Sequence, residues 1–287
     1  MIRRKNNKKY PNYAQLKIFY VILALHFLQM TDRMPNRPFI FISNDDGVQA
    51  KGIKELIDVL SPVADLLVVA PDSARSGQAC AITTHFPINL QCLKQGRRLS
   101  IYACTGTPAD CVKVAVSQLC NKRTPDLVVS GINHGDNSSV NAHYSGTMGA
   151  AYEGVLHDIP SVAFSLCDMN PDADFSPLRP YIIDIVFKTI VAGLPRYTCL
   201  NVNFPKEEKF KGTRICRMAA TRWDDEIAPV KNPRGGKMYW LVGHRTNLEP
   251  EAEDTDAWAL EHGYVAITPT TLDVTARELM GVLKDIF

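Results

Sequence analysis

Two adjacent aspartates, Asp45 and Asp46, directly follow the apolar run FIFIS and directly precede Gly47. Neighbouring carboxylates repel each other unless a positive charge lies between them. Their place at the end of a predicted buried strand therefore suggests a cation site. The alternative is structural, with Asp46 capping the turn before Gly47 and Asp45 in contact with solvent. The aspartates alone do not decide between the two.

Hydroxyl and amide side chains follow two other predicted strands, at residues 65–71 and 126–131. In an open parallel sheet, ligands bind outside the carboxyl ends of the strands, so these loops should open on the edge that carries the aspartates. Carboxylate, hydroxyl and amide oxygens suit Mg²⁺, Mn²⁺ or Ca²⁺ better than metals that prefer thiolate or imidazole. The candidate oxygen donors in these loops are Ser73, Ser76, Asn133, Asn137, Ser138, Ser139, Asn141, Ser145 and Thr147.

A phosphate site is suggested by Ser145, Gly146 and Thr147, which open a predicted helix over residues 145–158. Free backbone N–H groups at a helix start, with hydroxyls beside them and a glycine that admits an anion, can bind phosphate. Serine and threonine also cap helices without binding any ligand, which is the alternative. Arg75 either reaches a phosphate or lies solvated on the surface.

The motifs of several common nucleotide-binding and hydrolase sites are absent from the sequence. The sequence contains no Walker A loop, no G-x-G-x-x-G after the first strand and no G-x-S-x-G. It is therefore not a P-loop NTPase or a Rossmann dehydrogenase by motif. We assign no catalytic role to any histidine, His134 and His143 in the candidate loop included.

From residue 39, short β-branched runs alternate with segments of helical period, which is typical of β-α-β units and a mostly parallel sheet. We expect a doubly wound α/β core of roughly 170 residues. Residues 79–104 look like edge strands or a hairpin. The predicted strands are 39–43, 65–71, 126–131, 161–166 and 199–204, and the predicted helices are 53–60, 107–119, 145–158 and 180–194.

The pattern changes after Pro205. Segment 221–253 has no regular core period and is rich in charge, Pro and Gly, so it is either a mobile loop or an arm that a neighbouring subunit orders. Further strands are predicted in 212–219, 237–243 and 263–269, and a last helix over 275–287.

The net charge of +2 hides an asymmetry, because residues 1–36 hold seven Lys or Arg and one acid, which leaves 25 bases and 29 acids elsewhere. The remainder gives no composition-based case for nucleic-acid binding. Residues 1–36 resemble a signal segment but lack an A-x-A cleavage site, and their apolar stretch is short for a membrane span. We expect an extension outside a single domain at 37–287, with targeting or anchoring as the alternative. Eight cysteines without a C-x-x-C pair favour a reducing cytoplasm.

The motifs SNDDGVQAKGI, VVAPDSARSGQ, TGTPADCV, DLVVSGINHGDN, YSGTMGAAYEG, LNVNFP and GYVAITP occur in the order and spacing of the SurE family of nucleoside-monophosphate phosphatases. The resemblance runs from about Phe39 to the C-terminal helix. The chain departs from the family near Ser139, where a glycine is usual, and near Asn141, where an acid is usual.

The resemblance implies a Rossmann-like domain that hydrolyses nucleoside 5′-monophosphates, with 3′-monophosphates and short polyphosphate as further substrates in some members. It places one divalent metal ion per subunit on Asp45, Asp46, Ser76 and Asn133. It also implies a homodimer or homotetramer in which a C-terminal β-rich arm, here 221–253, reaches a neighbour.

We expect Asp45 and Asp46 to be the catalytic residues, with Asn137, Ser145, Gly146 and Thr147 binding the substrate phosphate. An aspartyl-phosphate route is an open alternative to direct attack by water. A nucleotide-binding regulatory module without turnover is the alternative function. No nucleic-acid or membrane partner is expected.

Overall fold

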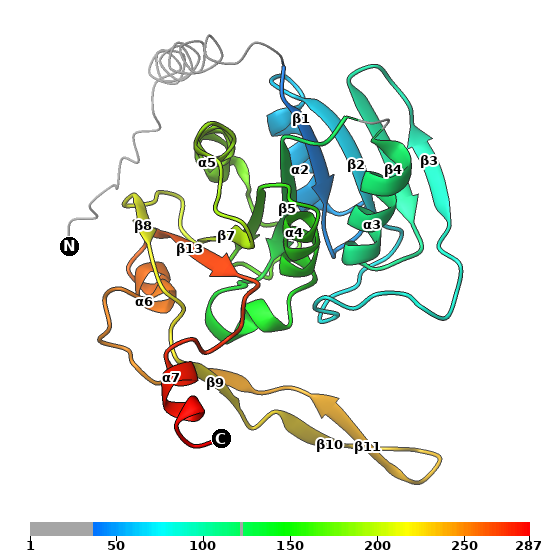
Figure 1. The fold of residues 1–287 in the computed structure, drawn as a ribbon. Coiled ribbons are helices and arrows are strands. Elements are labelled where there is room, and N and C mark those ends of the chain that lie inside the picture. Colours follow the sequence, from blue (N-terminus) through cyan, green and yellow to red (C-terminus); the bar gives the residue numbers. More distant parts are fainter. Residues whose placement is uncertain (1–36, 121–122) are drawn as a thin grey trace, which may run out of the picture. The chain divides into compact units, whose positions relative to one another are not determined.

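A nine-stranded sheet with helices on both faces runs through residues Phe39–Phe287, which form one compact unit of the computed structural model (Figure 1). The structure describes residues 37–120 and 123–287. The predicted extension over 1–36 lies outside the described residues, so the domain boundary at 36/37 stays a prediction.

The strand order β3-β4-β2-β1-β5-β6-β7-β13-β8 confirms the predicted doubly wound α/β fold. Strands β4, β2, β1, β5, β6 and β7 are parallel, whereas β3 and β13 run antiparallel to their neighbours β4 and β7. The strands are β1 Phe39–Ser43, β2 Asp65–Pro71, β3 Leu90–Lys94, β4 Leu99–Cys104, β5 Leu127–His134, β6 Ser161–Leu166, β7 Thr198–Phe204, β8 Thr213–Ile215 and β13 Val265–Thr271.

The helices cover the sheet in pairs, with α2 packed near α5 and α3 near α4 (Figure 1). Since both faces are covered, β1 carries consecutive apolar residues: Ile40, Phe41 and Ile42 are fully buried. The α-helices are α2 Lys51–Leu60, α3 Pro108–Val114, α4 Gly146–Leu156, α5 Arg179–Ala192, α6 Asp256–Glu261 and α7 Leu279–Lys284; 3₁₀ turns occur at Ser139–His143 and Ser176–Leu178.

The helix predicted at 107–119 shows how the local sequence specifies its start. The Thr107 hydroxyl accepts a hydrogen bond from the Asp110 N–H at 3.2 Å, and the Asp110 carboxylate accepts one from the Thr107 N–H at 2.9 Å. This reciprocal cap, with Pro108 in the first turn, begins α3 where predicted. The helix continues into a π-helical turn at Ala115–Leu119.

Two predicted elements are shorter than the sequence pattern suggested. Strands β3 and β4 form the expected edge hairpin, but residues 79–89 contain no strand. The alternation there was misleading because Pro87 lacks the N–H that a ladder needs. The C-terminal helix predicted at 275–287 spans only Leu279–Lys284, and none of its residues is buried. No described helix has the length and apolar character needed to cross a membrane.

Segment 221–253 contains a two-stranded antiparallel ribbon that projects from the sheet (Figure 1). We call residues 221–247 the arm; its base is β9 Thr221–Asp224 paired with β12 His244–Asn247, and its outer part is β10 Ile227–Lys231 paired with β11 Lys237–Leu241. All five side chains of β11 are exposed. The segment lacked a core period because its outer part packs against no core of this chain.

Candidate metal and phosphate site

The candidate site lies at the switch point of the sheet, between β1 and β5. From β1 the chain winds outward through β2 and β4, and from β5 it winds the other way through β6 and β7. Ligands of doubly wound folds bind in the crevice at such a point. A cavity of about 650 Å³ opens there, lined by Asp45, Ser76, Gly77, Asn133, His134, Asp136, Asn137, Asn141, Tyr144, Ser145, Met169, Trp223, Glu226, Leu241, Val242 and Gly243.

The turn after β1 is shaped by Asn44 and Gly47. The buried Asn44 side chain donates to the Gly47 carbonyl at 3.0 Å and accepts from the Gly47 N–H at 3.2 Å. Gly47 has φ of +100°, in the left-handed region that favours glycine, and a Cβ there would lie 3.3 Å from the backbone of Ser73. The Arg75 N–H donates to the Asp45 carbonyl at 2.7 Å. The turn and the loop that carries Ser76 are thus held together.

Asp45 is buried, with only 3% of its surface exposed, and its carboxylate accepts a hydrogen bond of 2.5 Å from the Thr147 hydroxyl. Burial, followed by the smaller effect of the Asp46 charge, raises the pKa of Asp45 to about 6 in spite of that bond. Burial also raises the pKa of Asp46, although its carboxylate accepts a hydrogen bond from the His134 backbone N–H at 3.4 Å, which by itself lowers the pKa. No lysine or arginine of the described residues forms an ion pair with either aspartate. A bound cation would stabilise the ionised form of both carboxylates.

Asn133 and Ser76 supply neutral oxygens at the same edge. The Asn133 side-chain N–H donates to the Gly135 carbonyl at 2.8 Å, which leaves Oδ1 as the group able to meet a cation. Ser76 is exposed and lines the cavity with Asp45 and Asn133, whereas Asp46 is not among the lining residues. Within the described residues, no three His, Cys, Asp or Glu side chains gather as a metal cluster. Two carboxylates with neutral oxygens fit a hard divalent ion such as Mg²⁺, Mn²⁺ or Ca²⁺.

Of the four predicted phosphate ligands, Ser145, Gly146 and Thr147 lie at the start of α4 and Asn137 lies in the loop before it, and three of the four also bond to other groups. The Ser145 hydroxyl accepts from the Met148 N–H at 3.0 Å, so it caps the helix as the structural alternative required, and it also lines the cavity. The Thr147 hydroxyl is engaged by Asp45. Asn137 lines the cavity while its side chain donates to Ser165 at 2.8 Å. Phosphate binding by these residues stays a prediction.

Gly146 makes direct contact between α4 and Asp45 possible. A Cβ at position 146 would lie 2.7 Å from the Asp45 Cβ and 3.0 Å from its Oδ2. We therefore expect Gly146→Ala to displace Asp45 and to lower activity by about 100-fold, because displacements of an ångström cost that much. Steady-state kinetics would measure this, with Gly281→Ala as the control, since a Cβ there meets nothing within 4 Å. Unchanged kinetics of Gly146→Ala would contradict the proposed role of Asp45.

The far wall of the cavity was missed by sequence reasoning. It is formed by Tyr144, by Met169 after β6 and by the arm residues Trp223, Leu241 and Val242. No spacing signal links these positions, since Trp223, Leu241 and Val242 reach the loop after β5 only through the folded arm. Arg75 does not line this cavity; its guanidinium donates to the Thr105 carbonyl at 3.0 Å beside a neighbouring cavity.

Ser139 and Asn141, where the sequence departs from the family pattern, both have structural roles. Ser139 has φ of +53°, in the left-handed region that favours glycine, and its hydroxyl donates to the buried carboxylate of Asp256 at 2.7 Å. Asn141 donates to Asp136 at 2.7 Å and accepts from the Trp223 indole at 3.0 Å. Asn141 therefore links the loop to the arm.

The fold and the site define a doubly wound α/β protein with an oxygen-rich candidate cation site at the switch point of its sheet. The family model described as Survival protein SurE matches residues 40–225. The protein therefore belongs to the SurE family, as the sequence motifs indicated.

Bacterial proteins named 5′-nucleotidase SurE resemble the chain over most of its length. The 5′-nucleotidase SurE of Bacteroides fragilis is 50% identical over 248 residues, which covers 86% of this chain and 97% of that protein. The 5′-nucleotidase SurE of Phocaeicola vulgatus is 51% identical over 249 residues, covering 87% and 96%. The crystal structure of the SurE protein from Aquifex aeolicus superposes with a TM-score of 0.73 at 34% identity, covering 87% of this chain and 99% of that chain.

Proposed function

We propose that the protein is a metal-dependent 5′-nucleotidase that hydrolyses nucleoside 5′-monophosphates to nucleoside and phosphate, with one divalent ion per subunit. The observation that carries the proposal is the pair Asp45 and Asp46, which has no lysine or arginine partner in the described chain. Asp45 lines a cavity that also holds Asn133 and Ser145. The names of the relatives from Bacteroides fragilis and Phocaeicola vulgatus support the same activity. Hydrolysis of 3′-monophosphates and short polyphosphate is part of the proposal through family membership alone.

The chain's own residues would hold both the ion and the phosphate at this edge of the sheet. Asp45, Asp46, Ser76 and Asn133 would hold the ion, and the Thr147 hydroxyl fixes the orientation of Asp45. When bound, the ion supplies Lewis acidity toward a phosphate oxygen. Ser145 and Gly146 at the start of α4, with Asn137 nearby, would donate to the remaining oxygens.

Direct attack by water is the preferred route, because a carboxylate that holds a metal is a poor base or nucleophile. The aspartyl-phosphate route through Asp45 or Asp46 is the alternative. A hydroxylamine-labile phosphoenzyme would favour that alternative.

A phosphate-release screen over nucleoside 5′- and 3′-monophosphates, with Mg²⁺, Mn²⁺ or Ca²⁺, tests the proposal. We expect turnover with at least one ion and its loss after chelation, restored when the ion is added back. Full activity in chelator-treated protein would show that no metal is needed. Nucleotide binding without phosphate release under every condition would favour the regulatory module.

The proposed assembly is a homodimer or homotetramer held by the arm, whose exposed Trp240 and Leu241 offer apolar contact surface. We place the protein in the cytoplasm, which is supported by eight cysteines that are all free thiols in the described chain. The excess of acids outside residues 1–36 supports the absence of a nucleic-acid partner. A membrane partner is likewise not proposed.

A further inference from the structure

The loop between β5 and α4, residues 135–145, connects the two halves of the candidate site. It starts next to Asn133 and ends at Ser145, and several of its side chains line the same cavity as Asp45. A shift of this loop would move the helix start that is proposed to bind phosphate relative to the residues that are proposed to hold the ion. Its position therefore matters for the reaction.

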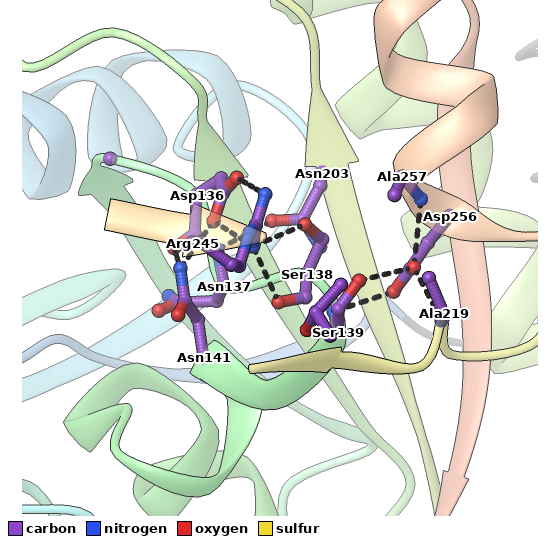
Figure 2. Close-up of polar contacts among 12 residues, drawn as sticks. Asp136, Asn137, Ser138, Ser139, Asn141, Asn203, Ala219, Arg245, Asp256 and Ala257 are labelled. Atoms are coloured by element: carbon purple, nitrogen blue, oxygen red, sulfur yellow. Dashed lines mark hydrogen bonds and ion pairs between the residues drawn. The ribbon is translucent and has the colours of Figure 1, made fainter. Parts of the chain in front are cut away.

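The base of the arm holds this loop through Arg245 of β12 (Figure 2). The guanidinium donates to both oxygens of Asp136, at 2.7 Å and 3.0 Å, and to the Ser138 carbonyl at 3.0 Å. The Arg245 and Asp136 side chains are only 21% and 18% exposed. A bidentate, partly buried pair of this kind fixes geometry in a way that a single exposed ion pair does not.

A second contact comes from the opposite strand of the arm. Trp223 of β9 pairs in register with Arg245, and its indole N–H donates to Asn141 at 3.0 Å. Asn141 in turn donates to Asp136 at 2.7 Å. One cross-strand pair of the arm thus holds the first residues of the loop and its 3₁₀ turn together.

Arg245 also changes the charge of the cavity. Asp136 lines it together with Asp45, and an unpaired carboxylate there would repel a phosphate dianion. Both Asp136 oxygens accept hydrogen bonds from Arg245, which neutralises this charge and engages both oxygens. The cavity can then admit an anion beside the ion site.

We propose that Arg245 is a positioning residue of the nucleotidase: it couples the arm to the loop 135–145 and neutralises Asp136 so that the substrate phosphate can enter. This inference deepens the proposed function and rests on it. It also means that the arm acts on the active site of its own chain.

Arg245→Gln should lower kcat/KM for a nucleoside 5′-monophosphate by about 100-fold, because the loop moves and Asp136 becomes an uncompensated anion. Part of this loss should appear as a higher KM. Adding Asp136→Asn should recover about tenfold by lowering KM, since the repelling charge is removed. Arg245→Lys should lie between wild type and Arg245→Gln because it keeps the charge but not the bidentate geometry.

The matched control is Arg217→Gln. Arg217 also lies at the root of the arm and pairs with Glu249 and Asp254, but its side chain is 48% exposed and has no bond to residues 135–145. Its kinetics should stay within about twofold of wild type. An equal loss in Arg217→Gln would overturn the proposal, because the effect would then reflect general loosening of the arm.

Amide hydrogen exchange of residues 135–144 provides a readout that needs no activity. Exchange should be faster in Arg245→Gln than in wild type, and unchanged in Arg217→Gln. Unchanged exchange in Arg245→Gln, or no recovery of KM on adding Asp136→Asn, would refute the role of Arg245. Failure of the wild type to release phosphate would instead refute the proposed function, while the exchange result still tests the coupling of arm and loop.

Discussion

Replacing Asp45 with asparagine should abolish metal-dependent phosphate release and at the same time stabilise the metal-free protein at neutral pH. The activity should fall about 1,000-fold or more, because charge stabilisation by a bound metal contributes several kcal/mol to the transition state. The fold should persist, since an asparagine oxygen can still accept the hydrogen bond from Thr147. A phosphate-release assay would measure the loss of activity, and calorimetric metal titration would measure the accompanying loss of metal binding.

The stability change follows from the raised pKa of Asp45. Burial raises this pKa from 3.8 to about 6, so the folded state favours the protonated carboxyl. That contribution is complete below pH 3.8 and is lost as the pH rises through about 6. At 1.36 kcal/mol per pKa unit the loss is about 3 kcal/mol, and the asparagine variant should escape it.

Denaturant unfolding of metal-free wild type and variant, at pH 4 to 8, would test this directly. The difference between the two proteins should grow with pH in favour of Asp45→Asn. The control is Asp58→Asn, at an exposed position of α2, which should change neither activity nor the pH profile. A variant less stable than wild type at neutral pH would show that Asp45 is stabilised in its ionised form.

Replacing Asp256 with alanine should cause the largest loss of stability in the region of the loop. The buried carboxylate accepts hydrogen bonds of 2.7 to 2.9 Å from the backbone N–H groups of Ser139, Ala219 and Ala257 and from the Ser139 hydroxyl (Figure 2). Alanine would leave three N–H groups without their acceptor. Each costs about 1 to 3 kcal/mol when buried, so the variant should lose at least about 3 kcal/mol of unfolding free energy.

Asp254→Ala is the matched control for this prediction. Its carboxylate lies two residues earlier, is 68% exposed and pairs with Arg217 at 2.8 Å. An exposed pair is worth at most about 1 kcal/mol, so this variant should unfold close to the wild-type midpoint. Equal losses in both variants would mean that Asp256 is not the anchor of Ser139 and the arm root.

The central part of the fold could be predicted because its residues follow simple periods. Buried parallel strands such as β1 carry runs of consecutive apolar residues, and helix starts such as Thr107 and Ser145 carry the side chains that cap them. The same pattern failed at residues 79–89, where alternation without a ladder partner forms no strand. Hydrophobic periodicity did not predict the shape of the arm, because its outer strands pack against no core.

The sequence by itself determined the doubly wound sheet and the acidic pair at its switch point, because strand ends and local turns depend on neighbours in the chain. Only the tertiary structure showed that Arg245 neutralises Asp136 and that Asp256 anchors Ser139, pairs that are 109 and 117 residues apart. Contacts at such separation have no period, and they form only after the arm and α6 pack beside the loop. The oxygen donors can therefore be located from short stretches of sequence, whereas the walls and the charge of the cavity depend on segments that are distant in the chain.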